Sequence, residues 1–153
     1  MSHFEHQLGQ LMPDFTLQNQ HGQAVKLSEL WEDSPVVVFF YPKDGTPVCT
    51  AQACSFRDGI GQFEQLGVKV VGVSQDTVLD HAQFAEKHAL PYSILSDPNN
   101  DVRTLWKVPK FLGWMPGRVT YVLKQGGELL HAFTGMMQAD VHVKEAIKVL
   151  NAL

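Results

Sequence analysis

The segment that decides the fold is Val36-Val-Val-Phe-Phe-Tyr-Pro-Lys-Asp-Gly-Thr-Pro-Val-Cys-Thr50. Its first five residues are continuously apolar, which indicates a strand buried on both faces of a sheet. Pro47 suits the first position of a helix, because the N–H that it lacks would have no partner there, and Thr46 is then the N-cap. A buried strand therefore leads through a turn into a helix, which we expect to cover residues 47–66 and to end at Gly67.

The rest of the chain alternates between strand and helix patterns. We expect further strands at 15–17, 24–27, 36–41, 68–74, 92–95, 119–123 and 128–134, and further helices at 28–30, from Asp76 or Thr77 to 88, at 100–106 and at 140–150. The first two strands form a hairpin, and so do the last two. This alternation predicts an α/β fold with a mixed sheet and helices on both faces.

The composition is that of a globular protein. Of 153 residues, 44% are hydrophobic and 18% charged, so we expect a single domain over residues 1–153. The net charge is −4 and no basic run is present, which argues against nucleic acid or a membrane surface as a partner. The first residues lack the features of an export signal. The two cysteines thus favour a redox role over a disulfide framework, and we expect a cytoplasmic protein.

Cys49 lies in the first turn of the expected helix. Unpaired backbone N–H groups and the positive end of the helix dipole stabilise a negative charge at such a position. A cysteine there is more readily ionised, and the thiolate is the nucleophilic form of the side chain. A lone cysteine in an α/β core is more often an inert apolar residue, so the neighbours of Cys49 decide between the two interpretations.

These neighbours resemble a known active site. The pattern Pro42-x-x-x-Thr46-x-x-Cys49 resembles the motif of the peroxiredoxins, which are thiol peroxidases with a thioredoxin-like fold. Tyr41-Pro-Lys-Asp-x-Thr-Pro-x-Cys-Thr50, with a second cysteine at Cys54, is similar to the PrxQ or bacterioferritin comigratory protein branch, whose members are atypical 2-Cys enzymes. Pro116-Gly-Arg-Val-Thr-Tyr-Val-Leu123 resembles a second signature of that branch. The likeness extends over nearly the whole chain, and it implies a thioredoxin-like fold with an N-terminal hairpin extension.

The resemblance implies a role for each matched residue. Cys49 attacks the peroxide, and Arg118 lies beside it, favours the thiolate and hydrogen-bonds the substrate. The hydroxyl of Thr46 orients the peroxide oxygens, and Pro42 shields the sulfur. The N–H groups of Val48 and Cys49 donate to the charge that develops on the leaving oxygen. Many members of the branch have glycine in place of Val48, and this difference bears on loop flexibility rather than on catalysis.

The resemblance also implies that Cys54 resolves the sulfenic acid of Cys49 as an intramolecular disulfide. In a regular helix, residues five apart have α-carbons about 8.6 Å apart and point about 140° away from each other, whereas a disulfide needs α-carbons within about 7 Å. The helix must therefore unwind between about residues 46 and 56. Gly59 and Gly61 weaken the same helix, or they allow close packing against a neighbouring strand. Cys54 as a buried structural thiol is the alternative.

The expected enzyme reduces hydrogen peroxide and organic hydroperoxides and is recycled by thioredoxin or a glutaredoxin-like dithiol. No metal or other cofactor is implied, because the seven histidines lack the ligand spacings of a zinc site. A monomer is expected, because no further cysteine is available for a disulfide between subunits. The alternatives are a protein dithiol–disulfide oxidoreductase and a redox-sensing binding module.

The segment 111–115 is unusually apolar. We expect it to belong to the core, or to form the rim of the active site or a docking surface for the reductant.

Overall fold

The structure is a computed structural model that describes residue 4, residues 7–136 and residues 139–153. In chain order its elements are β1 (Thr16–Gln18), β2 (Ala24–Lys26), α1 (Leu27–Trp31), β3 (Val36–Phe40), α2 (Pro47–Asp58), α3 (Ile60–Gln65), β4 (Lys69–Ser74), α4 (Val78–His88), β5 (Ser93–Ser96), α5 (Asp101–Leu105), β6 (Val119–Leu123), β7 (Leu129–Thr134) and α6 (Ala139–Asn151). The predicted strands and helices are all present with ends that differ by at most two residues, except that the helix expected over 47–66 is divided in two.

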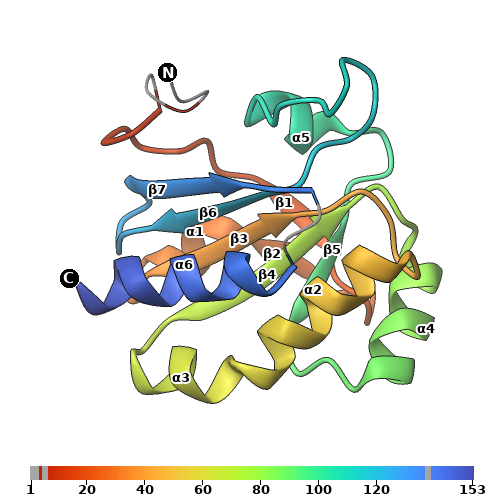
Figure 1. Cartoon of the computed structure of the whole chain (residues 1–153), viewed down its shortest axis with the longest axis horizontal. Helices are drawn as coiled ribbons and strands as arrows, with labels where there is room; N and C mark the ends of the chain where they lie inside the picture. Colours follow the sequence, from red (N-terminus) through yellow and green to blue (C-terminus); the bar gives the residue numbers. More distant parts are fainter. Residues whose placement is uncertain (1–3, 5–6, 137–138) are drawn as a thin grey trace.

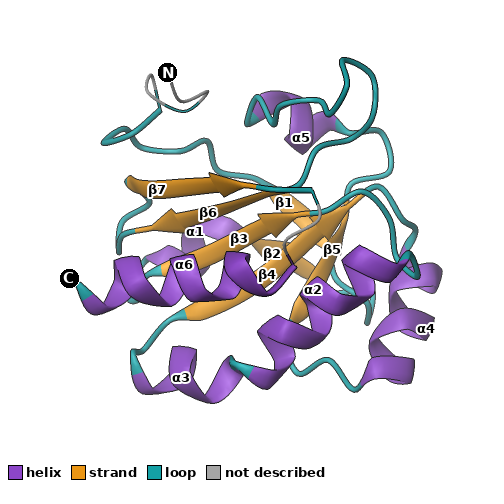
Figure 2. Cartoon of the chain, viewed as in Figure 1, coloured by secondary structure: helices purple, strands orange, loops and turns teal. Residues whose placement is uncertain are grey.

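The strands form one mixed sheet in the order β2-β1-β5-β4-β3-β6-β7 (Figures 1 and 2). Strand β3 lies parallel to β4 and antiparallel to β6, with Phe40 opposite Val119. The two expected hairpins are β1–β2 and β6–β7. The α/β class and the thioredoxin-like arrangement with an N-terminal hairpin are therefore confirmed.

Helices cover both faces of the sheet, and β3 contributes side chains to both cores. Val36, Val38 and Phe40 pack with α1 and α5 in one core, whereas Val37 and Phe39 pack with α2, α3, α4 and α6 in the other. Figure 1 shows α2 and α6 in front of the strands and α1 behind them. All five residues of β3 are completely buried. The prediction that this continuous apolar run is a strand buried on both faces is therefore confirmed.

The helix that carries both cysteines ends earlier than predicted, at Asp58, and a separate helix α3 follows Gly59. A β-carbon at Gly59 would lie 3.2 Å from a methyl group of Val143 in α6, so the chain approaches α6 closely at this point. A β-carbon at Gly61 would lie in open space. Close packing is therefore the role of Gly59, although its neighbour is a helix and not the strand that we expected.

The single domain over residues 1–153 stays a prediction, and positions 1–3, 5–6 and 137–138 of that range lie outside the described residues. Among the helices that are described, none combines the length and the apolar character that crossing a bilayer requires.

Candidate active site

Cys49 is the third residue of α2, which follows β3 after the loop 41–46. Pro47 is the first helical residue, and Thr46 before it has the extended backbone of an N-cap. The side chain of Thr46 makes no capping bond, and no group in the described part of the chain accepts a hydrogen bond from the N–H of Val48 or Cys49. These two N–H groups are therefore available to an anion or to a polarised oxygen at the start of the helix.

The sulfur of Cys49 is held in the interior, because the side chain belongs to the inward face of α2. Cys49, Ala53 and Phe56 follow helical spacing on that face and pack against the sheet. Cys49 is only 1% exposed. In this conformation the thiol is therefore closed to solvent.

Arg118 contacts the sulfur directly, as the resemblance implied. Its Nη2 donates to Cys49 Sγ at 3.2 Å, and its Nε donates to the carbonyl of Met136 at 3.1 Å. Arg118 is 2% exposed. The pairing of Phe40 with Val119 explains the contact, because it places the residue before β6 beside the end of β3, where the chain turns toward α2. A buried positive charge thus lies against the thiol.

Gln52 completes this cluster, and the sequence analysis missed it. Its Oε1 accepts a hydrogen bond from Nη1 of Arg118, and the side chain is completely buried. Its Nε2 has no hydrogen-bond partner among the described residues. Gln52 follows Cys49 by three positions, so the two side chains share one face of the helix. The three-residue spacing from Cys49 could have indicated that Gln52 lies near the sulfur.

Thr46, Pro42 and Val48 are half-buried around the start of α2. The hydroxyl of Thr46 donates to the carbonyl of Lys43 at 3.0 Å, within the turn that leads into the helix. The structure therefore places these three residues in the same loop and first helical turn as Cys49. Among the residues named from the sequence, Arg118 is the one that makes a hydrogen bond to the sulfur in the described part of the chain.

Cys54 lies further along α2 and is half-buried, and both cysteines are free thiols. The helix between them is regular, so the disulfide is incompatible with this conformation. The hydroxyl of Tyr92 donates to the carbonyl of Ala53 at 2.7 Å. Burial, followed by the charge of Cys54, raises the pKa of Tyr92 well above its ordinary value. Tyr92 is therefore a neutral hydrogen-bond donor that fixes the helix next to Cys54.

A buried polar network holds the loop that precedes α2. Asp44 accepts from the hydroxyl of Tyr41 at 2.6 Å and pairs with Nδ1 of His81 at 2.5 Å, and its N–H donates to Asp76 at 2.8 Å. Asp76 also accepts from the hydroxyl of Ser74 at 2.5 Å. The potential ligand atoms of Asp44, Asp76 and His81 lie within 4.8 Å of one another. These atoms bond to one another or to neighbouring groups, so the cluster serves to anchor the loop.

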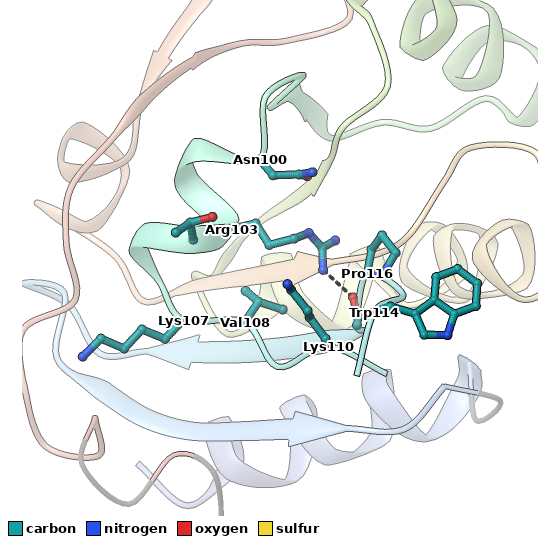
Figure 3. Close-up of a pocket in the computed structure, with 9 residues that line it drawn as sticks. Asn100, Arg103, Lys107, Val108, Lys110, Trp114 and Pro116 are labelled. Carbon is teal, nitrogen blue, oxygen red and sulfur yellow. Dashed lines mark hydrogen bonds between the residues drawn. The ribbon is translucent and has the colours of Figure 1, made fainter. Parts of the chain in front are cut away.

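Arg103 is a second buried arginine that the sequence analysis missed. It lines a pocket of about 510 Å³ between α5 and the loop before β6 (Figure 3). Trp114, Lys107 and Lys110 line the same pocket. Trp114 is 73% exposed, and Phe111 and Leu112 at 39% and 70% are also exposed, so the core interpretation of the segment 111–115 is wrong.

Comparison with known proteins agrees with this arrangement. The sequence profile of the AhpC/TSA family matches residues 8–132. The chain belongs to this family. The chloroplastic peroxiredoxin Q of rice (Oryza sativa subsp. japonica) is 44% identical over 146 residues, which are 95% of this chain and 67% of the rice protein.

Two solved structures give the same result. Peroxidoxin BcpB from Mycobacterium tuberculosis superposes with a TM-score of 0.89 at 37% identity, covering 96% of this chain and 97% of BcpB. The bacterioferritin comigratory protein of Xanthomonas campestris, studied for its alkyl peroxide reduction activity, superposes with a TM-score of 0.80 at 25% identity over 90% of each chain. The resemblance to the PrxQ branch of the peroxiredoxins is confirmed, and the chain is a thiol-dependent peroxidase.

The expected cytoplasmic location is contradicted by these relatives. The rice protein and other plant relatives are named chloroplastic. The expectation rested partly on the number of cysteines, which separates reducing from oxidising compartments but does not distinguish one reducing compartment from another.

Proposed function

We propose that Cys49 is the residue that attacks the peroxide and that Cys54 resolves the product as an intramolecular disulfide. The substrates are hydrogen peroxide and organic hydroperoxides, in keeping with the alkyl peroxide reduction studied in the Xanthomonas relative. A thioredoxin-type or glutaredoxin-like dithiol then reduces the disulfide. The protein acts as a monomer, because both sulfurs of this cycle belong to one helix.

The contact between Arg118 and Cys49 carries this proposal. A guanidinium 3.2 Å from a buried sulfur favours the thiolate, because an opposite charge at this distance stabilises the ionised form. The hydrogen bond from Arg118 to Gln52 and the one to the carbonyl of Met136 orient the guanidinium. The charge therefore remains in place when a substrate enters.

The reaction follows from these positions. The thiolate of Cys49 donates an electron pair to one peroxide oxygen, and the O–O bond breaks. The sulfur is oxidised by two electrons to a sulfenic acid, and the second oxygen leaves as hydroxide or alkoxide, which takes up a proton. Arg118 and the free N–H groups of Val48 and Cys49 donate hydrogen bonds where negative charge develops. The hydroxyl of Thr46, which can both donate and accept, orients the peroxide, and Pro42 shields the sulfur from water.

Resolution requires a change in α2. In the regular helix the α-carbons of Cys49 and Cys54 are about 8.6 Å apart and the side chains diverge, so we propose that the first turns unwind in the sulfenic acid form. The thiol of Cys54 then attacks the sulfur of Cys49, a disulfide forms and water leaves. Unwinding also moves Cys49 from the interior to the surface, where a dithiol donor reaches it. The alternative role of Cys54 as a structural thiol requires an external thiol for this step.

Steady-state peroxide consumption tests the proposal. We expect the wild type to turn over with thioredoxin and its reductase, Cys49→Ser to be inactive, and Cys54→Ser to consume one equivalent of peroxide and then stop. Full steady-state activity of Cys54→Ser would contradict the resolving role. Activity of Cys49→Ser would contradict the whole assignment. Consumption of many equivalents by the wild type separates an enzyme from a sensor that reacts once.

A further inference from the structure

Arg103 belongs to α5, which packs on the face of the sheet opposite to α2. The side chain is 8% exposed, and the guanidinium carbon lies 5.7 Å from the ring centre of Phe40, the last residue of β3. The carboxylate of Asp97 accepts hydrogen bonds from the N–H groups of Val102 and Arg103, which fixes the start of α5. The guanidinium is therefore held by packing and by the anchored backbone of its helix.

Two hydrogen bonds connect Arg103 to the two segments that form the active site. Nη1 donates to the carbonyl of Gly117 at 2.7 Å, the bond drawn in Figure 3, and Nη2 donates to the carbonyl of Tyr41 at 2.9 Å. Gly117 immediately precedes Arg118. Tyr41 immediately precedes the loop that leads to Cys49. One planar side chain thus binds the backbone at the start of both segments.

The backbone at Gly117 is fixed from another side as well. A β-carbon at this position would lie 1.9 Å from the carbonyl oxygen of Pro109, so the two backbone segments are in close contact. The carbonyl of Gly117 therefore has little freedom to move toward a shorter donor. This arrangement requires a side chain with the length and the two-pronged geometry of arginine.

We propose that Arg103 is a positioning residue for the peroxide reaction, which holds the loop that carries Cys49 and the strand end that carries Arg118 at a fixed separation. The inference rests on the proposed role of Cys49. Arg103 makes no hydrogen bond to the sulfur, so it acts through the two carbonyls. Misplacement of a reacting group by about 1 Å lowers a rate by up to about a hundredfold.

The charge of Arg103 also acts on the site. Burial lowers the pKa of Arg103 to about 10, so the guanidinium remains positive at neutral pH. Cys49 and Arg118 both contribute to the electrostatic environment of Arg103. Lysine at position 103 keeps a positive charge but loses the two-pronged geometry, whereas methionine loses both.

The test uses the full chain with Cys54→Ser, so that only Cys49 reacts. Two quantities are measured separately: the second-order rate constant of a single turnover with hydrogen peroxide, and the rate of alkylation of Cys49 by iodoacetamide at neutral pH. For Arg103→Lys we expect a peroxide rate constant about 10- to 100-fold lower and alkylation no faster than in the parent, because a fold that merely loosened would expose the buried sulfur and speed its alkylation. For Arg103→Met we expect an equal or larger loss of the peroxide rate constant. Lys110→Met, on an exposed residue of the same pocket, should match the parent in both.

A rate constant within twofold of the parent for Arg103→Lys would overturn the inference. This variant keeps the buried charge, so it remains decisive if Arg103→Met does not fold, which near-ultraviolet circular dichroism establishes. The parent protein distinguishes this failure from a failure of the proposed function. If the parent does not react with peroxide, the role of Cys49 is wrong, whereas equal reactivity of parent and Arg103→Lys refutes only the role of Arg103.

Discussion

Nη2 of Arg118 lies 3.2 Å from the sulfur of Cys49, and both residues are at most 2% exposed. Water screens such a pair weakly, so the guanidinium acts on the sulfur more strongly than it would at the protein surface. The two residues are far apart in the chain and meet because β3 and β6 pair antiparallel at the centre of the sheet. The pairing of these two strands therefore places the positive charge of Arg118 beside the sulfur.

Replacement of Arg118 should lower the reactivity of Cys49 with peroxide. We expect Arg118→Met to reduce the second-order rate constant by about 10²- to 10³-fold, because a donor to both the thiolate and the leaving oxygen is lost. Stopped-flow measurement of a single turnover gives the rate constant. Arg57→Met, on the same face of the sheet but bonded to Asp58 and to the carbonyl of His88, is the matched control. Equal rates for Arg118→Met and wild type would contradict the proposed role.

Gln52 should affect the same step through Arg118. In Gln52→Glu a carboxylate faces Nη1 of the guanidinium, so the positive charge is partly neutralised and the thiolate of Cys49 is less favoured. We expect the second-order rate constant with peroxide to be about tenfold lower, measured by stopped flow in a single turnover. Gln52→Met, which adds no charge, should show a smaller loss. If the two variants lose the same rate, Gln52 does not act through charge.

Oxidation should unfold the first turns of α2. The disulfide is incompatible with the regular helix, so we expect amide hydrogens between about residues 46 and 56 to exchange faster in the oxidised protein. Hydrogen exchange followed by mass spectrometry measures this, with α4 as an internal reference. The reduced protein is the control, and Cys54→Ser treated with one equivalent of peroxide, which stops at the sulfenic acid, should show the same faster exchange. Equally slow exchange of this segment in the reduced and oxidised wild type would rule out unwinding.

Acid should destabilise the fold through His142. This residue is completely buried, and its imidazole lies between the hydroxyl of Thr120 at 2.7 Å and the carbonyl of Gly135 at 2.9 Å. Burial lowers the pKa of His142 from 6.5 to about 4. Above pH 6.5 the folded and unfolded states are both neutral at this position. As the pH falls toward 4 the unfolded state binds a proton that the folded state does not, so stability is lost.

The loss reaches about 3 kcal/mol near pH 4. Denaturant unfolding of wild type and His142→Gln at several pH values measures it, because the stability difference between the two proteins should shrink as the pH falls from 7 to 4. His21→Gln, on an exposed histidine, should keep a constant difference from wild type. A difference between wild type and His142→Gln that does not change with pH would show that His142 does not contribute.

The sequence predicted the elements well because their signals are local. The buried strand β3, Pro47 at the start of α2, and the turns of the two hairpins depend on residues that are neighbours in the chain. The division of the long helix at Gly59 was not predicted, because it depends on the approach of Val143 from a distant helix. The burial of Cys49 was not predicted either, because it depends on which face of α2 packs against the sheet.

The residues of the candidate site could be predicted where they belong to a recognisable sequence motif. Cys49 and Arg118 belong to two segments that resemble peroxiredoxin signatures, and the structure brings them together. Gln52 and Arg103 were missed for different reasons. Gln52 shares a helical face with Cys49, so its position could have been inferred from spacing. Arg103 donates hydrogen bonds to the carbonyls of Tyr41 and Gly117, and no pattern in the chain indicates such contacts.

The most direct test of the central claim is chemical trapping of the sulfenic acid. Reduced Cys49→Ser and Cys54→Ser are each treated with one equivalent of hydrogen peroxide in the presence of dimedone, and the modified residue is identified by peptide mass spectrometry. The account predicts a dimedone adduct on Cys49 in Cys54→Ser and no adduct on Cys54 in Cys49→Ser. An unmodified Cys49, or rapid modification of Cys54 when Cys49 is absent, would contradict it.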